Sequence, residues 1–313
     1  MGSYERNQNH NIKNEAGPFR LAFRKGTLRI TNKFGLPAPL VRAVSNSKYN
    51  KGDADFSVTE LIKPPRITAL EAQHWEELEE DASDRLWALM GSAGHEVLRR
   101  SADGGIVEER VSIELGGLKI SGQMDYVVAD NAIIDYKFVS VWAIQDGAKP
   151  EWEQQLNCYR YMAKQYGVVV KELKIIAILR DWSKLEAKRD SSYPQSQVTV
   201  LPIRMWDDAV VEQWLKMRTI AHVAARNGIL PNCMPDDVWE KPERYACMKK
   251  GNKRASRVLD TRLDAGTWIA SQPKPSDFNI EVRPAERPRC ESYCAVSEFC
   301  QQFKDWKAAH GRT

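Results

Sequence analysis

The sequence lacks any apolar run of about 18 residues, the length that a membrane-spanning helix requires. Its polar start, MGSYERNQNHNIKNEAGPFR, has no apolar signal segment, and the chain has no internal repeat or long low-complexity stretch. These absences argue against a membrane protein, a secreted precursor and a solenoid. We therefore expect a protein of the cytoplasm. Its 313 residues suffice for one domain with a real hydrophobic core and an appendage.

A strong net charge is also missing, because 46 Lys and Arg nearly balance 42 Asp and Glu, which gives a formal charge of +4. This value is only a weak indication of a polyanionic partner. Locally, basic residues gather in one short stretch, at Lys249, Lys250, Lys253, Arg254 and Arg257. With the nearby aromatic residues Trp239, Tyr245 and Trp268, this stretch fits a path for a single nucleic-acid strand. An ordinary solvated surface is the alternative.

Hydrophobic periodicity predicts an α/β (or α+β) core at residues 55–227, with a central mixed β-sheet flanked by helices. Helices are predicted at 55–63, 67–101, 151–167 and 206–227, and strands at 106–115, 118–128, 132–141, 172–182 and 197–205. Gly116-Gly117 is a strong hairpin signal, and Ser57 with Glu60 fits a capping box. We expect residues 1–54 to form a partly disordered arm. Residues 228–313 are expected to form an irregular, cysteine-bearing segment packed on the core.

Two aspartates stand among apolar residues in the stretch GQMDYVVADNAIIDYK, which covers residues 122–137. Burying an unpaired carboxylate is costly, so something must compensate for Asp125 and Asp135. Strand alternation places Asp135 and Lys137 on one face, and a neighbouring hairpin strand would bring Asp125 to the same place. Two carboxylates that converge with a lysine suit a hard cation such as Mg²⁺ or Mn²⁺. The alternative is a buried Asp–Lys ion pair.

Further polar residues can reach the same place. His95 lies late in the helix that precedes the sheet, directly after GSAG at 91–94, which indicates a joint or close packing. Alternation within VEERVSI points Glu109 inward rather than its neighbour Glu108. Gln155 and Tyr159 are four residues apart, so they share one face of the predicted helix. None of these features is specific alone.

Taken in order, His95, G122-x-x-D125, D135-x-K137 and Q155-x-x-x-Y159 resemble the PD-(D/E)XK nuclease superfamily, in its RecB-like and Cas4-like exonuclease branch. The resemblance implies a restriction-endonuclease-like core. It also implies that His95, Asp125, Asp135 and the backbone carbonyl of Tyr136 bind the divalent metal. Lys137 would then position and activate the attacking water, and Gln155 and Tyr159 would orient Lys137 or hold the scissile strand.

The resemblance therefore implies a metal-dependent DNA exonuclease that prefers single strands and serves recombination, repair or phage DNA metabolism. Such a protein would work in the host cytoplasm if it came from a phage, and it could act with a recombination partner protein. Two alternatives stay open. One is a non-catalytic nucleic-acid-binding protein on the same fold, and the other is a zinc-stapled endonuclease.

Six cysteines are present, and three of them form the pattern Cys290-x3-Cys294-x5-Cys300. Such clustering indicates a metal, either Zn²⁺ or an iron–sulfur cluster, and both need a fourth ligand. Cys233 is the favoured fourth ligand, with Cys247 as the competitor, while Cys158 is expected to be a buried apolar residue. The Cas4-like branch carries a [4Fe–4S] cluster, so the resemblance favours that cluster over Zn²⁺. This chain departs from the branch because no cysteine precedes His95.

Overall fold

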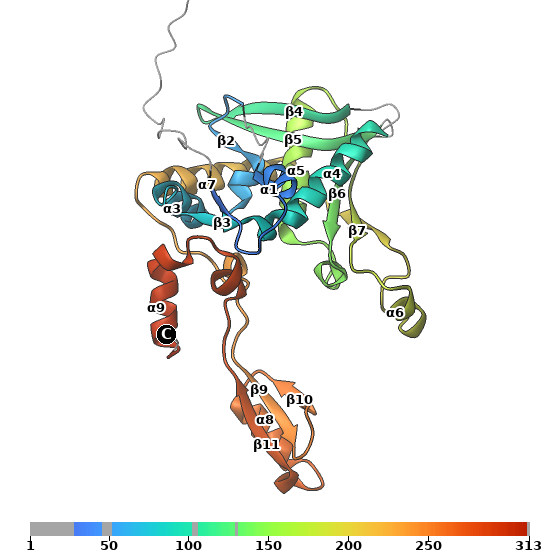
Figure 1. The fold of residues 1–313 in the computed structure, drawn as a ribbon, viewed down its shortest axis with the longest axis vertical. Coiled ribbons are helices and arrows are strands. Elements are labelled where there is room, and N and C mark those ends of the chain that lie inside the picture. Colours follow the sequence, from blue (N-terminus) through green and yellow to red (C-terminus); the bar gives the residue numbers. More distant parts are fainter. Residues whose placement is uncertain (1–27, 46–51, 102–105, 129–130, 312–313) are drawn as a thin grey trace, which may run out of the picture.

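A computed structural model describes residues 28–45, 52–101, 106–128 and 131–311, without the side chains of 106–109 and 126–128. Its centre is a six-stranded mixed sheet in the order β2–β5–β6–β7–β8, with β4 paired to β5 (Figure 1). These strands are β2 (Phe56–Ser57), β4 (Ile106–Leu115), β5 (Leu118–Val128), β6 (Ala132–Val139), β7 (Glu172–Leu179) and β8 (Val198–Ile203). The predicted α/β class with a central mixed sheet is confirmed.

Helices flank this sheet and connect its strands. They are α1 (Ala38–Ser45), α2 (Val58–Ile62), α3 (Pro65–Gln73), α4 (Leu86–Arg100), α5 (Pro150–Gln165), α6 (Lys184–Arg189) and α7 (Asp208–Arg226). Ser57 caps α2 as predicted, because its hydroxyl accepts a hydrogen bond from the Glu60 amide at 3.1 Å. None of the helices in the described ranges is long and apolar enough to cross a membrane.

Strand β5 changes its partner part-way along one edge. There β2 pairs with Ile120 and Ser121 in parallel, whereas β6 pairs antiparallel only with Tyr126, Val127 and Val128. Strand β4 pairs along the opposite edge, and a turn at Gly116-Gly117, in which both glycines have positive φ, joins it to β5. In the part of the chain that the structure describes, no strand pairs with residues 122–125 on the first edge. We call this opening between β5 and β6 the fork.

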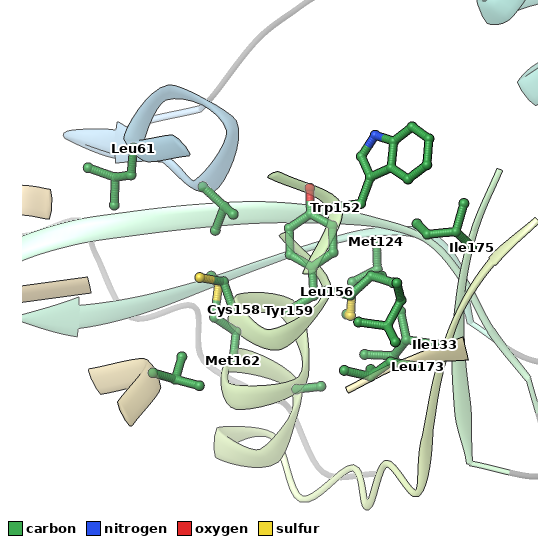
Figure 2. Packing of buried hydrophobic residues seen from close by; sticks show 14 of the residues in the cluster. Leu61, Met124, Ile133, Trp152, Leu156, Cys158, Tyr159, Met162, Leu173 and Ile175 are labelled. Carbon is green, nitrogen blue, oxygen red and sulfur yellow. The ribbon is translucent and has the colours of Figure 1, made fainter. Parts of the chain in front are cut away.

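Helix α5 joins β6 to the parallel strand β7 and covers the sheet beside the fork. Pro150 starts the helix, the acidic Glu151 and Glu153 suit its first turn, and Gly167, with φ of 77°, follows its end. The apolar face of α5 packs into the core with strand residues such as Met124 and Ile133 (Figure 2). The α5 residues in this core are Trp152, Leu156, Cys158, Tyr159, Met162 and Ala163.

Helix α4 crosses β6 at a point of very close approach. A Cβ atom added to Gly94 would lie 2.1 Å from the Phe138 Cζ atom, whereas one added to Gly91 would meet nothing within 4 Å. The close packing expected at 91–94 is therefore present, at Gly94. It brings the next residue, His95, to the sheet, where its ring meets the Phe138 ring edge-on at 5.8 Å.

The single helix predicted over residues 67–101 was wrong. The structure ends α3 at Gln73 and inserts strand β3 (Glu79–Asp81), which pairs in parallel with β1 (Arg29–Thr31). Asp81 explains the break, because its carboxylate accepts hydrogen bonds from the Lys33 amide at 2.7 Å and the Ser83 amide at 3.0 Å. These bonds lower the pKa of Asp81 and start a new helical turn there.

The expectation of irregular chain after residue 228 was also wrong for residues 244–283, which we call the lobe. Strands β10 (Arg257–Leu259), β9 (Arg244–Lys249) and β11 (Phe278–Arg283) form a sheet beside α8 (Arg262–Ala270). Ala246, Cys247 and Ala265 are buried within it. Figure 1 shows the lobe standing away from the main sheet. Its short strands alternate with charged turns, so their hydrophobic pattern is weak in the sequence.

A second hydrophobic cluster ties the end of the chain to α3. Ile67 and Leu70 of α3 pack there with Val296 and with Phe303 and Trp306 of α9 (Gln301–Ala309). Arg66 adds hydrogen bonds from its guanidinium to the carbonyls of residues 230 and 231, at 3.0 and 2.9 Å. The lobe is therefore an insertion between two segments that are both anchored on α3.

The close approach of α4 and β6 can be tested with two glycines of one helix. Gly94→Ala should lower the free energy of unfolding by roughly 1–3 kcal/mol, because its methyl group must displace the Phe138 ring. Gly91→Ala is the matched control and should raise stability by up to about 1 kcal/mol, since alanine is the better helix former and space is free. Urea unfolding measures both. Equal effects of the two variants would contradict the packing.

Candidate active site and cysteine cluster

The fork brings both aspartates to one place. Asp125, at the open edge of β5, accepts a hydrogen bond from the Tyr136 amide of β6 at 3.2 Å through Oδ2. The same oxygen lies 3.2 Å from His95 Nδ1, which arrives from α4. In an extended strand, the N–H and C=O of one residue leave on the same edge, so the Tyr136 carbonyl also points toward β5. The predicted convergence of Asp125 with β6 is therefore present.

A chain of polar contacts runs from Asp135 to helix α5. Lys137 Nζ approaches Asp135 Oδ2 to 2.6 Å and donates a hydrogen bond to Gln155 Oε1 at 3.1 Å. Gln155 Nε2 in turn donates to the Tyr159 hydroxyl at 3.0 Å. The alternation of β6 and the four-residue spacing on α5 therefore place these four side chains as the sequence predicts.

Asp135 is the most deeply buried member of the site, with 2% of its surface exposed. Its contact with Lys137 lacks hydrogen-bond alignment, and Oδ2 has no hydrogen-bond partner among the described residues. A buried oxygen of this kind is costly unless another positive group approaches it. Asp135 Oδ2 is thus held by the charge of Lys137 and not by a hydrogen bond.

The two carboxylates repel each other. Burial, followed by the charge of Asp135, raises the pKa of Asp125 to about 6, although the positive charges of His95 and Lys137 act in the opposite direction. Burial also raises the pKa of Tyr159 well above its ordinary value, so its phenol stays protonated. The site therefore carries unfavourable negative charge that a cation would relieve.

The donor set fits a hard divalent cation, since it offers carboxylate oxygens, a carbonyl edge and one imidazole. Among the described residues, no three His, Cys, Asp or Glu side chains are already spaced as a complete ligand set. At the fork the carboxylates already have other contacts, because Lys137 lies against Asp135 and His95 lies against Asp125. A cation would compete with these contacts for the same oxygens.

One predicted site residue cannot be placed. Glu109 lies on β4, where its backbone pairs with Met124, but its side chain lies outside the described part of the structure. Two further residues, to which the sequence alone assigned no role, shape the site. Gly122 leaves room for the Tyr159 ring, whose Cε1 atom would lie 2.8 Å from an added Cβ, and Phe138 positions α4. The G-x-x-D pattern was the available signal for Gly122.

Four cysteines line one cavity beneath α3. Cys233 enters from the segment before the lobe, and Cys290, Cys294 and Cys300 come from the segment after it. Apolar residues of α3 and α9 form much of the remaining wall. Burial raises the pKa of the Cys233 thiol to about 12 and that of Cys290 to about 11, although nearby arginines act in the opposite direction. Burial thus favours the protonated form of these two thiols.

The position of Cys233 is well defined. Gln302 of α9 accepts a hydrogen bond from the Cys233 amide and donates one to its carbonyl, both at 2.8 Å. Cys247, the competing ligand, is buried in the lobe instead, where its Sγ lies 3.7 Å from the Ala265 carbonyl. Cys158 is buried in the main core, as expected. The geometry therefore groups Cys233, and not Cys247, with the other three cysteines.

The predicted basic stretch lies at the far end of the lobe. Lys249, Lys250, Lys253 and Arg254 are all exposed there, in the turn that leads from β9 toward β10. Figure 1 shows this part of the lobe away from β6 and α5, so the stretch does not border the fork. Residues 244–283 contain nine Lys and Arg against four Asp and Glu, a charge of +5, compared with +4 for the whole chain. The lobe thus holds the excess positive charge.

The aromatic residues predicted beside this stretch are largely engaged in packing. Trp268 meets Phe278 edge-on at 5.5 Å inside the lobe. Trp239 packs against Tyr293 at 5.3 Å near the cysteine segment. Both tryptophans are thus held by aromatic contacts, and Trp239 lies outside the lobe that carries the basic turn.

Comparisons with known proteins found likeness only among solved structures. The chain matches no protein-family model, and no curated protein matches it. The crystal structure of SSO0001 is 18% identical, over 58% of this chain and 81% of that chain, with a TM-score of 0.38. The alkaline exonuclease LHK-Exo from Laribacter hongkongensis is 12% identical, over 55% and 88% of the two chains, with a TM-score of 0.35. Likenesses this distant do not bear on activity.

Because the surroundings of Asp125 disfavour its charged form, the free energy of unfolding should depend on pH. Because its folded pKa of about 6 lies above the unfolded value of about 3.9, the folded state holds the proton more tightly. Stability of the metal-free protein should therefore fall as pH rises from about 4 to 6 and stay lower above that. Asp125→Asn removes this loss and should stabilise the protein at pH 8 by roughly 1–3 kcal/mol, with little effect at pH 4.

Thermal unfolding in a chelator at both pH values measures this difference. The exposed Asp146→Asn, on the loop after β6, is the control and should change little at either pH. The same change from Asp125→Asn at pH 4 and at pH 8 would show that Asp125 carries no such penalty.

Proposed function

We propose that this chain is a divalent-metal-dependent deoxyribonuclease of the PD-(D/E)XK superfamily, an exonuclease of the RecB-like and Cas4-like branch that prefers single-stranded DNA. One observation carries the proposal. Asp125 and Asp135 meet at an open strand edge, with Lys137 held beside them by a glutamine from α5. A buried ion pair without function would not need a second carboxylate whose charge opposes the first.

His95, Asp125, Asp135 and the Tyr136 carbonyl would hold the cation. When bound, Mg²⁺ or Mn²⁺ would act as a Lewis acid on the scissile phosphate and make a coordinated water more acidic. Binding would also relieve the repulsion between the two carboxylates and engage the Asp135 oxygen that lacks a hydrogen bond. His95 is fixed for this role by the packing of Gly94 on Phe138.

Lys137 would act on the phosphate. Its ammonium group has three N–H donors, of which Gln155 accepts one, while the Asp135 carboxylate balances its charge. The remaining donors can stabilise negative charge on a phosphate oxygen and orient the attacking water. Tyr159 keeps Gln155 in place through its protonated hydroxyl, so these two residues are positioning residues.

For the cysteine cavity we propose a structural [4Fe–4S] cluster held by Cys233, Cys290, Cys294 and Cys300, with Zn²⁺ as the alternative. Support comes from the four thiols that line one cavity and from the two arginines, Arg66 and Arg287, in its wall, whose charges suit an anionic cluster. Metal binding there would displace the thiol protons and couple loading to folding. It would fasten both ends of the lobe insertion to α3.

The exposed basic turn of the lobe is the proposed second contact with DNA, through phosphates rather than bases. Its charge and exposure support this role, while its distance from the fork argues against a part in catalysis. Action in recombination, repair or phage DNA metabolism, and cooperation with a recombination protein, remain proposals that rest on the family resemblance.

Lys137→Ala tests the catalytic proposal. Digestion of end-labelled linear single-stranded DNA with Mg²⁺ should fall by at least roughly 10²-fold, because a donor to the developing charge is lost. Binding of the same DNA in a chelator should persist. Lys174→Ala on the adjacent strand β7 is the control and should cleave normally.

A closed circular single strand should stay intact in the same assay if the enzyme needs an end. Cutting of the circle would replace the exonuclease proposal with an endonuclease. If the wild type binds DNA but cuts neither form, with Mn²⁺ as well, the non-catalytic alternative takes its place.

Cys233→Ser tests the cluster. The purified variant should lose the bound iron and sulfide, together with the visible charge-transfer absorbance of a thiolate-bound cluster, and should unfold at a lower temperature. Cys247→Ala is the control and should keep its metal, because Cys247 lies in the lobe. A colourless wild type that contains zinc would select the Zn²⁺ alternative, and unchanged metal content in Cys233→Ser would exclude Cys233 as a ligand.

A further inference from the structure

Two tryptophans stand exposed where the central parallel strands end. Trp87, in the first turn of α4, has 59% of its surface exposed, and Trp142, in the short 3-10 helix Val141–Ile144 after β6, has 73% exposed. Large apolar side chains with this exposure are informative when they gather at one place, since water contact is unfavourable for them. Neither residue has a role in the site described so far.

Two hydrogen bonds and one cation–π contact bring the two tryptophans to the same end of the sheet. The Arg180 amide, just after β7, donates a hydrogen bond to the Val139 carbonyl at 2.9 Å. The Val141 amide donates to the carboxylate of Asp181 at 2.7 Å, so the segments after β6 and β7 are joined. Trp142 follows the first of these segments directly. The Arg180 guanidinium reaches from the second to lie 4.2 Å from the centre of the Trp87 ring.

The group formed by Trp87, Trp142 and Arg180 lies close to the fork, as measured along helix α4 and along strand β6. Trp87 precedes His95 by eight residues on α4, which is about 12 Å along a helix. Val139 follows Lys137 by two residues on β6, which is about 7 Å along a strand. Successive bases of a stacked strand are about 3.4 Å apart, so a few nucleotides would span either distance.

The chemistry of the group suits an unpaired nucleic-acid strand. An indole face stacks on any base, and an exposed guanidinium binds phosphate through several donors. Among the described residues, no carboxylate lies within ion-pair distance of Arg180, and the arginine fixes the Trp87 ring by a cation–π contact. A duplex offers few free base faces, because its bases already stack on one another.

We propose that Trp87 and Trp142, together with Arg180 against the Trp87 ring, form a platform on which bases of a single strand stack as the strand enters the fork. The platform is the source of the preference for unpaired DNA. This inference rests on the proposed nuclease function for the identity of the ligand, and it names residues that select the strand rather than cleave it.

Binding without cleavage tests the platform separately from the nuclease. In a chelator, wild-type protein should bind a fluorescent single-stranded oligonucleotide, and its tryptophan emission should be quenched on binding. Trp87→Ala and Trp142→Ala should each weaken this binding at least about fivefold, because a stacked base contributes roughly 1–3 kcal/mol. Trp87→Phe and Trp142→Phe keep an aromatic face and should largely restore it.

Two further probes separate stacking from charge. An oligonucleotide with abasic residues should bind the wild type as weakly as the intact strand binds the double alanine variant, since it has no bases to stack. Blunt duplex, held through its phosphates, should bind the wild type and the double variant alike. Single-strand affinity that is unchanged in the double alanine variant, or duplex affinity that falls in parallel, would overturn the platform.

The outcomes are distinguishable from those of the nuclease assay. A protein that cleaves DNA but binds single strands independently of both tryptophans retains the proposed function and loses the platform. A protein that never cleaves, yet binds single strands through both tryptophans, retains the platform and loses the nuclease.

Discussion

The burial of two carboxylates side by side near an open strand edge is the constraint on which the site depends. Strand β5 pairs with β2 at one end and with β6 at the other, so within the described ranges no strand lies beside residues 122–125 on that edge. The opening lets Asp125 bond to the Tyr136 amide and lets His95 enter from α4. A continuous ladder would satisfy the backbone but would leave no room for these groups. The fork thus lacks local strand pairing, and the space lets charged side chains come together.

Much of this site could be predicted from the sequence because it follows from short-range periodicity. Alternation along β6 joins Asp135 to Lys137, and helical spacing joins Gln155 to Tyr159. Features set by distant contacts could not be predicted. The break in the helical pattern goes with long-range contacts such as the Lys33 amide on Asp81, and the lobe folds although its strands carry little apolar signal. Spacing alone likewise could not separate Cys233 from Cys247, which differ in the sheet or loop that holds them.

The cysteine cavity and the fork lie in two hydrophobic clusters that helices α3 and α7 connect. Arg218 of α7 donates hydrogen bonds to the carbonyls of residues 61–63, at the end of α2 and just before α3, at 2.7 to 3.1 Å. Helix α3 then supplies the apolar wall of the cysteine cavity through Ile67 and Leu70. Metal at the cysteines would therefore stabilise the end of the chain and the base of the lobe. It would reach the fork only through these helices.

The proposed function depends most directly on one property, that the aspartates of the fork bind a divalent cation. Titration of Mn²⁺ into the metal-stripped protein, followed by electron paramagnetic resonance, measures this for the wild type and for Asp135→Asn. The account predicts a bound Mn²⁺ in the wild type that is lost or greatly weakened in Asp135→Asn, while both proteins stay folded. Equal Mn²⁺ binding by the two proteins, or none by the wild type with DNA present, would contradict it.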